Sequence, residues 1–117
     1  MINLPFDRAL IVRAPHVDNI LDNGKIIEIR SRKTNVRGRV GLIESGTGLI
    51  VGEVNIDGCS DSALTPKQMI DLSHLHQVDD LELLKKWRYP WYLSNAIRYD
   101  QPIPYDHPKG AVIWVRI

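Results

Sequence analysis

The sequence predicts a small α+β domain, a β-barrel of about five or six strands with a few short helices. Short runs of apolar and β-branched residues recur along the chain between glycine, proline and asparagine, as strands do in small all-β frameworks. Apolar residues at helical spacing appear only in brief stretches. Since 117 residues suffice for one core, we expect residues 1–117 to form a single domain.

The first half of the chain predicts four strands and one helix. Residues 8–13 read RALIVR, a short β-branched run typical of a strand. Pro15 suits the first turn of a helix, which we expect to end at Asn23 and Gly24. Three more strands are expected at residues 26–32, 39–44 and 49–56, the last two joined by a hairpin loop at residues 45–48.

The second half predicts two short helices and a final strand. Thr65 followed by Pro66 is typical of a helix N-cap, and Asp79 or Asp80 caps a second helix. Prolines at 90, 102, 104 and 108 predict that residues 89–109 are irregular or extended. Residues 110–117 are expected to form the last strand.

Composition restricts the class of protein. The single cysteine, Cys59, cannot form an intrachain disulfide, and the N-terminal residues lack the layout of a signal peptide. The apolar runs are too short to span a membrane. The four histidines lack the spacing of a metal site. We therefore expect a cytoplasmic protein that has no membrane partner, metal or cofactor.

Charge is unevenly distributed along the chain. A net charge of +1 argues against a protein that coats nucleic acid through electrostatics alone. However, residues 25–39 contain six cationic side chains and one anionic one, whereas residues 53–82 contain seven anionic and one cationic. We expect a molecule with one basic side.

The basic stretch at residues 23–39 reads NGKIIEIRSRKTNVRGR. Side chains alternate between the faces of a strand, so Ile27 and Ile29 should face the core while Glu28, Arg30 and Arg32 point the other way, where the binding hypothesis expects a solvated groove. A guanidinium in such a groove can bind a phosphate or a base edge. The same pattern is also typical of an ordinary solvated strand face.

Aromatic residues offer stacking surfaces for bases. Tyr105 is the better candidate because its neighbours are loop-forming, whereas Trp91 and Trp114 are expected in the core. His107 either reaches the cleft or holds its own loop through hydrogen bonds.

Three segments together resemble the ASCH domain (activating-signal-cointegrator homology), a family of the PUA-like superfamily. They are Lys25-x-x-Glu28-Ile29-Arg30-Ser31, then Arg37-Gly38-Arg39 with Gly52-Glu53-Val54, and finally the distal stretch of residues 91–95 and 102–110 with Trp114. The resemblance implies a PUA-like β-barrel with helices at its openings and a cleft lined by the Lys-x-x-Glu-x-Arg strand. Family members are generally regarded as RNA-binding, and some have been assigned ribonuclease activity.

Two functional hypotheses follow. In the first, the domain binds RNA or a modified nucleotide through eight residues: Lys25, Glu28, Arg30, Arg32, Lys33, Arg37, Tyr105 and His107. In the second, it is a metal-independent hydrolase in which Glu28 is the general base and Lys25 and Arg30 stabilise developing negative charge. The resemblance extends to an acetylcytidine amidohydrolase, but Glu28 stands where that enzyme has its threonine nucleophile, which disfavours the same acyl-transfer chemistry.

Overall fold

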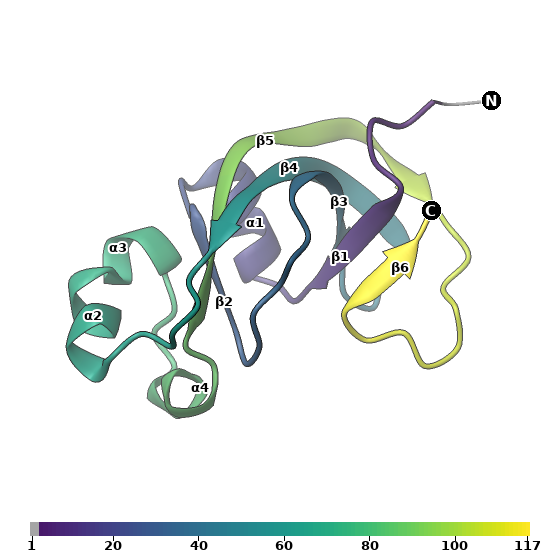
Figure 1. The fold of residues 1–117 in the computed structure, drawn as a ribbon. Helices are drawn as coiled ribbons and strands as arrows, with labels where there is room; N and C mark the ends of the chain where they lie inside the picture. The colour runs from purple at the N-terminus through teal and green to yellow at the C-terminus, as the bar shows by residue number, and fades with distance from the viewer. Residues whose placement is uncertain (1–2) are drawn as a thin grey trace.

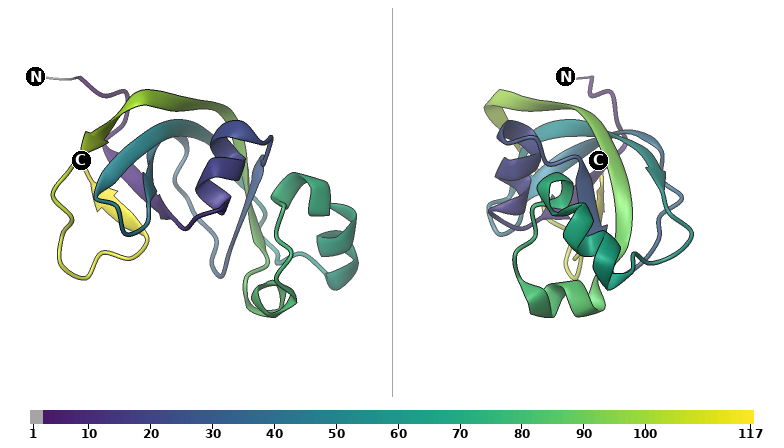
Figure 2. Two further views of the ribbon diagram at one scale, coloured as in Figure 1. Left: turned by 180° about the vertical axis from the view of Figure 1, so that it is seen from behind. Right: turned by 90° about the vertical axis from the view of Figure 1, so that its left-hand side faces the viewer.

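The computed structural model describes residues 3–117, apart from the side chain of residue 81. Six strands form one sheet in the order β2-β5-β4-β3-β1-β6. The sheet curls into a half-barrel around helix α1, while helices α2, α3 and α4 gather at one end of the molecule (Figure 1; Figure 2). This architecture confirms the predicted α+β class with a small barrel-like sheet.

The elements follow the predicted order. Strands β1 to β6 span Arg8–Val12, Ile27–Arg30, Gly38–Glu44, Leu49–Cys59, Tyr89–Pro104 and Trp114–Arg116. Helices α1 to α4 span His16–Asp22, Pro66–Asp71, Ser73–His76 and Leu81–Lys86. Strand β1 pairs in parallel with β3, and the other strand pairs are antiparallel. None of the helices in residues 3–117 is long and apolar enough to cross a membrane.

The helix boundaries match the local signals in the sequence. Thr65 and Gln68 form a reciprocal capping box at the start of α2, and Asp80 accepts hydrogen bonds from the first turn of α4. Gly24, just after α1, has the left-handed φ of 75° that turns the chain toward β2. The helix expected after Thr65 is divided in two, because α2 ends at Asp71 and α3 starts at Ser73.

Strand β5 is the element that the sequence analysis did not assign. We expected residues 89–109 to be irregular or extended, and residues 89–104 are extended, forming one strand of 16 residues. Strand β2 pairs only with Tyr89–Tyr92, so one side of β5 has no partner strand beyond that point. Pro102 and Pro104 lie in the part of β5 that pairs only with β4. A proline, which has no backbone N–H to donate, is tolerated best where a strand has a partner on one side only. Two other strands are shorter than expected: β2 ends at Arg30, and β6 has three residues.

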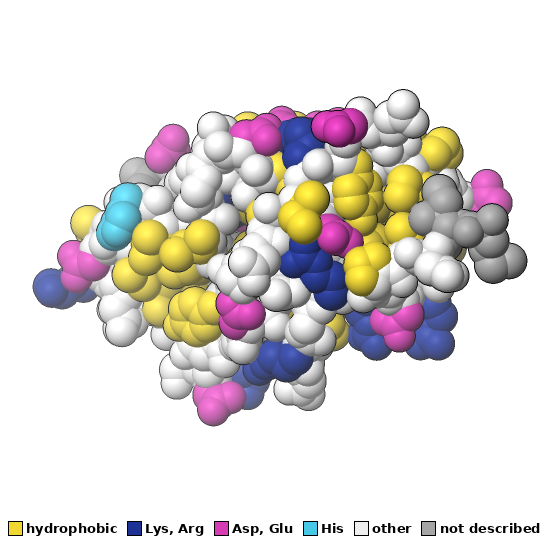
Figure 3. Space-filling model, turned by 90° about the horizontal axis from the view of Figure 1, so that it is seen from above, with side chains coloured by type: hydrophobic (Ala, Val, Ile, Leu, Met, Phe, Trp, Pro, Cys, Tyr) yellow, Lys and Arg dark blue, Asp and Glu magenta, His cyan; other side chains and the backbone are white. Residues whose placement is uncertain are grey.

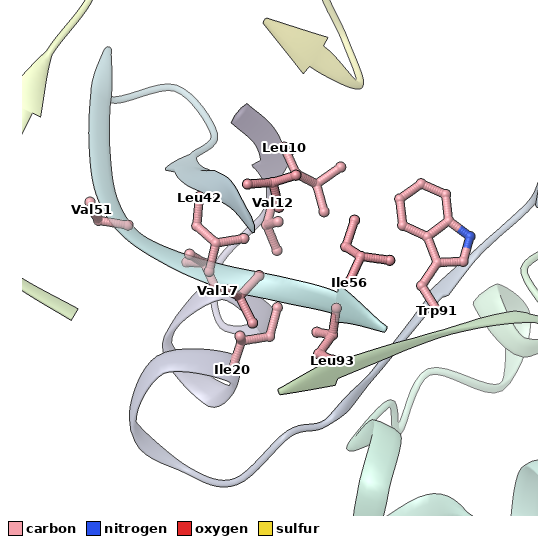
Figure 4. Packing of buried hydrophobic residues seen from close by; sticks show 11 residues of the cluster. Leu10, Val12, Val17, Ile20, Leu42, Val51, Ile56, Trp91 and Leu93 are labelled. Atoms are coloured by element: carbon pink, nitrogen blue, oxygen red, sulfur yellow. The ribbon is translucent and has the colours of Figure 1, made fainter. Parts of the chain in front are cut away.

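The main hydrophobic core fills the half-barrel (Figure 4). Val17 and Ile20 of α1 meet buried side chains from β1, β3, β4 and β5 there. Gly52 lets α1 approach β4, since a Cβ at this position would lie 2.7 Å from Leu21 Cδ2. At the end of this core, Trp91 stacks on Trp114 with ring centroids 6.0 Å apart, which agrees with the structural role expected for both.

Side chains bridge the two edges of the sheet. Strands β2 and β6 lie at opposite ends of the strand order and do not pair with each other. Arg30 of β2 donates from Nη2 to the Ile11 carbonyl oxygen of β1 at 2.8 Å. Its guanidinium also lies 5.6 Å from the ring centroid of Trp91, and Arg8 lies 5.8 Å from that of Trp114. Contacts of Arg30 with Trp91, of Trp91 with Trp114 and of Trp114 with Arg8 thus link β2 and β5 to β6 and β1.

A separate hydrophobic cluster joins β2 to the helices. Ile27 and Ile29 pack with Leu64, Met69 and Val78, which belong to α2 and the segments flanking the helices. The alternation in β2 is therefore as predicted, with the isoleucines on one face and Glu28 and Arg30 on the other.

Replacing Ile29 with alanine should lower the free energy of unfolding by about 2 to 5 kcal/mol, because it removes buried methyl groups and leaves a cavity. Ile29 is 4% exposed, whereas Ile26, which is 45% exposed, offers a matched control. Urea denaturation measures both variants. Equal losses for Ile29→Ala and Ile26→Ala would contradict the packing described for β2.

Candidate functional site

Three charged side chains form a continuous chain at the barrel end nearest the helices. Lys25 has a side chain that is 0% exposed, and its Nζ lies 3.5 Å from Glu28 Oε1. Glu28 is 6% exposed, and its Oε2 accepts a hydrogen bond from Arg30 Nε at 3.0 Å and lies 2.8 Å from Arg30 Nη2. The fork of Arg30 also reaches the Ile11 carbonyl, so each charge in the chain has a partner.

Lys25 holds β2 against the helices. Its Nζ also donates to the carbonyl oxygen of His76 at the end of α3. The ring of His76 is fixed in turn, with Nε2 2.7 Å from the Met69 carbonyl oxygen and Nδ1 accepting from the Val78 N–H. Burial lowers the pKa of Lys25 and the carboxylate of Glu28 opposes that effect.

The burial of Glu28 corrects the expectation of a solvated groove. Glu28 is opposite Trp91 in the β2–β5 register, and Trp91 is 3% exposed. Arg30 lies over the same indole ring. The carboxylate is thus covered by its own partners, which alternation within one strand does not reveal.

Glu28 and Arg30 line a cavity of about 160 Å³, which we call the Glu28 cavity. Its polar lining residues are Arg13, His16, Glu28, Arg30 and Ser45. Its apolar lining residues are Ile11, Val12 and Ile29 from β1 and β2, and Val78, Leu83, Leu84, Trp87 and Val112 from α4 and the loops. Lys25 is not part of the wall. A cavity of about 150 Å³ is known to accept benzene, so this volume suits one planar ring.

His16 is a site residue that the sequence analysis missed. It begins α1 and lines the Glu28 cavity. Its Nδ1 is buried and has no hydrogen-bond partner among the described residues. Burial, followed by the charge of Lys25, lowers the pKa of His16, so the neutral imidazole is favoured at neutral pH. No motif marks this residue; only the folding of the β1–α1 turn toward β2 brings it to Glu28.

The expected phosphate-binding cations are on the loop after β2, which we call the basic loop (residues 31–37). Arg32 and Lys33 are exposed. The carbonyl oxygen of Arg32 accepts from Trp91 Nε1 at 2.9 Å, which fixes the start of this loop beside Arg30. Arg37 instead bonds the Thr34 and Val36 carbonyls and lines a separate hollow with other arginines.

Tyr105 and His107 do not line the Glu28 cavity. They line an adjoining hollow of about 440 Å³, which we call the Tyr105 hollow. The two hollows share part of their walls, namely Ile11, Arg13, Ser45 and Val112.

A second buried ion pair cross-links the outer side of β3, β4 and β5. Arg39 Nη2 lies 3.1 Å from Glu53 Oε1, and Tyr99 donates to Glu53 Oε2 at 2.9 Å. Arg39 also donates to the Asn95 carbonyl of β5. Burial and the neighbouring carboxylate raise the pKa of Tyr99, which favours the donating phenol.

The outer face seen in Figure 3 carries interspersed charges. Basic and acidic side chains lie among hydrophobic ones there, with no continuous basic patch (Figure 3). Within residues 3–117, no group of three or more His, Cys, Asp or Glu side chains is arranged to hold a metal ion.

Replacing Glu28 with alanine should lower the free energy of unfolding by about 3 to 5 kcal/mol, because the ammonium of Lys25 is left buried without its carboxylate. Adding Lys25→Met to Glu28→Ala should recover part of that loss. Glu82→Ala is the control, since Glu82 has a side chain 79% exposed in its pair with Lys85, and should change stability by no more than about 0.5 kcal/mol. Chemical denaturation of wild type, Glu28→Ala, the double variant and Glu82→Ala measures these differences. A Glu28→Ala variant as stable as Glu82→Ala would refute a structural role for the buried Lys25–Glu28–Arg30 charges.

Known structures share this fold. The crystal structure of ASCH from Zymomonas mobilis aligns with a TM-score of 0.71 at 8% identity, covering 94% of this chain and 86% of that chain. Two mutant proteins of the same Zymomonas mobilis ASCH align with TM-scores of 0.71 and 0.72, also at 8% identity and 94% of this chain, covering 87% and 88% of theirs. At this identity the likeness concerns the fold alone.

Sequence comparison identifies the family. No curated protein matches the chain. The family model of the ASCH domain matches residues 10–103, which include part of β1, all of β2 to β4, all four helices and nearly all of β5. Because the match covers most of the sequence, the chain belongs to the ASCH domain family.

Proposed function

We propose that this ASCH domain binds single-stranded RNA, or one modified nucleotide, by taking a single base into the Glu28 cavity. The observation that carries the proposal is the cavity itself, about 160 Å³ and lined by both polar and apolar side chains. A nucleobase needs both kinds of lining, since its faces are apolar and its edges carry donors and acceptors. Trp87 and the leucines of α4 offer surfaces for the faces.

The polar lining residues retain hydrogen-bonding capacity for a base edge. Nη1 of Arg30 has no acceptor among the described residues, because Nε and Nη2 make the bonds to Glu28 and Ile11. His16 has an unpartnered Nδ1. Each carboxylate oxygen of Glu28 can accept more than one hydrogen bond. Since Arg30 and Glu28 are already held by each other and by the Ile11 carbonyl, a ligand would not have to order them.

The basic loop supplies charge outside the cavity. Arg32 and Lys33 are exposed, and neither side chain is in a salt bridge among the described residues. Arg37 adds a third cation to this loop. With so few phosphate contacts and a net charge of +1, non-specific affinity should be on the order of micromolar or weaker at physiological salt. The proposal places this binding in the cytoplasm, where single-stranded RNA is available.

The geometry supports binding over hydrolysis. Lys25 does not line the cavity, and its ammonium is committed to Glu28 and the His76 carbonyl. Glu28 already accepts a hydrogen bond from Arg30, and two cations flank it. A general base needs a carboxylate within reach of the substrate proton and free to accept it.

Binding of fluorescein-labelled single-stranded RNA, followed by anisotropy at low salt, tests the proposal. Trp87→Leu and Arg30→Lys should each weaken binding by about tenfold or more, because they remove a stacking surface and a guanidinium fork. Alanine at Arg32 or Lys33 should weaken binding modestly and reduce its salt dependence. Lys67→Ala is the matched control, since Lys67 has a side chain 86% exposed on α2 and lines none of the hollows described above.

Thermal melts must first show that each variant is folded. Absence of binding at low salt, or wild-type affinity in both Trp87→Leu and Arg30→Lys, would refute the proposal. The recovered RNA also tests hydrolysis: cleavage by wild type that is lost in Glu28→Gln would favour the enzyme hypothesis.

A further inference from the structure

The Tyr105 hollow adjoins the Glu28 cavity, and Arg13 lines both. Arg13 follows the last residue of β1 and is exposed. Its guanidinium has no hydrogen bond or salt bridge among the described residues, whereas Arg8, Arg30, Arg39 and Arg98 are each paired with a carboxylate. An unpaired guanidinium in the wall common to two hollows is suited to an anion that spans them.

The Tyr105 hollow has a fixed aromatic wall. Tyr105 Oη lies 2.7 Å from His107 Nδ1, and His107 Nε2 lies 2.9 Å from the Ala111 carbonyl oxygen. Because a carbonyl only accepts, Nε2 carries the proton and Nδ1 accepts from the tyrosine hydroxyl. Burial raises the pKa of Tyr105, which keeps that hydroxyl protonated. Both rings are thus held in place before any ligand arrives.

The two hollows differ in size. The Glu28 cavity, at about 160 Å³, suits one ring, whereas the Tyr105 hollow, at about 440 Å³, falls in the range of ordinary small-ligand sites. An aromatic wall beside a cation is the usual arrangement for a stacked base and its phosphate in single-stranded nucleic-acid sites.

We propose that the Tyr105 hollow is a second nucleotide subsite, in which one base of single-stranded RNA stacks on Tyr105 while Arg13 binds the phosphate that links it to the base in the Glu28 cavity. The minimal ligand is then a dinucleotide and not a single nucleoside. This inference rests on the proposed function, because it takes the Glu28 cavity to be the first base site.

Calorimetric titration with three classes of probe tests the second subsite: the four ribonucleosides, their monophosphates, and the dinucleoside monophosphates built from them. A monophosphate has the phosphate without the second base. The best dinucleoside monophosphate should therefore bind about tenfold or more tightly than either of its component monophosphates, the gain expected from one stacked base.

Two variants and a control test whether the tighter binding of dinucleoside monophosphates comes from Tyr105 and Arg13. Tyr105→Leu should remove it while leaving monophosphate binding unchanged. Arg13→Gln should weaken monophosphates and dinucleoside monophosphates but not nucleosides. Arg116→Gln should behave as wild type, since Arg116 is exposed on β6 and lines neither hollow.

Failure of the two proposals is distinguishable. If monophosphates bind in a Trp87-dependent manner but dinucleoside monophosphates bind no more tightly, the first site stands and the second subsite is overturned. A gain that survives both Tyr105→Leu and Arg13→Gln also overturns it. If no probe of any class binds, the proposed function fails and the second subsite fails with it.

Discussion

A lysine ammonium without exposed surface must be paired, and the pairing of Lys25 organises this molecule. Its carboxylate partner, Glu28, is also the partner of Arg30, and Arg30 reaches across to the Ile11 carbonyl of β1. At the other end, Lys25 binds the His76 carbonyl of α3. One chain of charges therefore connects the helices, β2 and the far side of the half-barrel. Removing the shared carboxylate of Glu28 leaves Lys25 buried without a charge partner, which costs far more than the loss of a surface ion pair.

The same chain also shapes the candidate site. Because Glu28 and Arg30 are fixed by each other, they present a rigid polar surface to the Glu28 cavity, while α4 supplies part of its apolar lining. Stability and the proposed binding thus depend on the same residues. A substitution at Glu28 is therefore expected to change both the free energy of unfolding and the affinity for RNA. Residues of the wall that bear no structural charge pair, such as Trp87 and Arg13, separate the two roles.

Local patterns in the sequence predicted much of the fold. Period-two alternation placed Ile27 and Ile29 opposite Glu28 and Arg30, and capping residues located the starts of α2 and α4. The length of β5 was not predictable from its prolines, because their tolerance depends on where β2 stops pairing. The burial of Glu28 depends on Trp91, far along the chain. His16 and Arg13 join the site only through the turn between β1 and α1, and no spacing rule marks them.

A crystal structure of the protein with a short single-stranded RNA tests the central claim most directly. The account predicts one base inside the Glu28 cavity, with its edge within hydrogen-bonding distance of Arg30 and its face against Trp87. The Lys25–Glu28–Arg30 chain should be unchanged from the structure described above. RNA bound instead across the outer face of β4 and β5, with no base in the cavity, would contradict it.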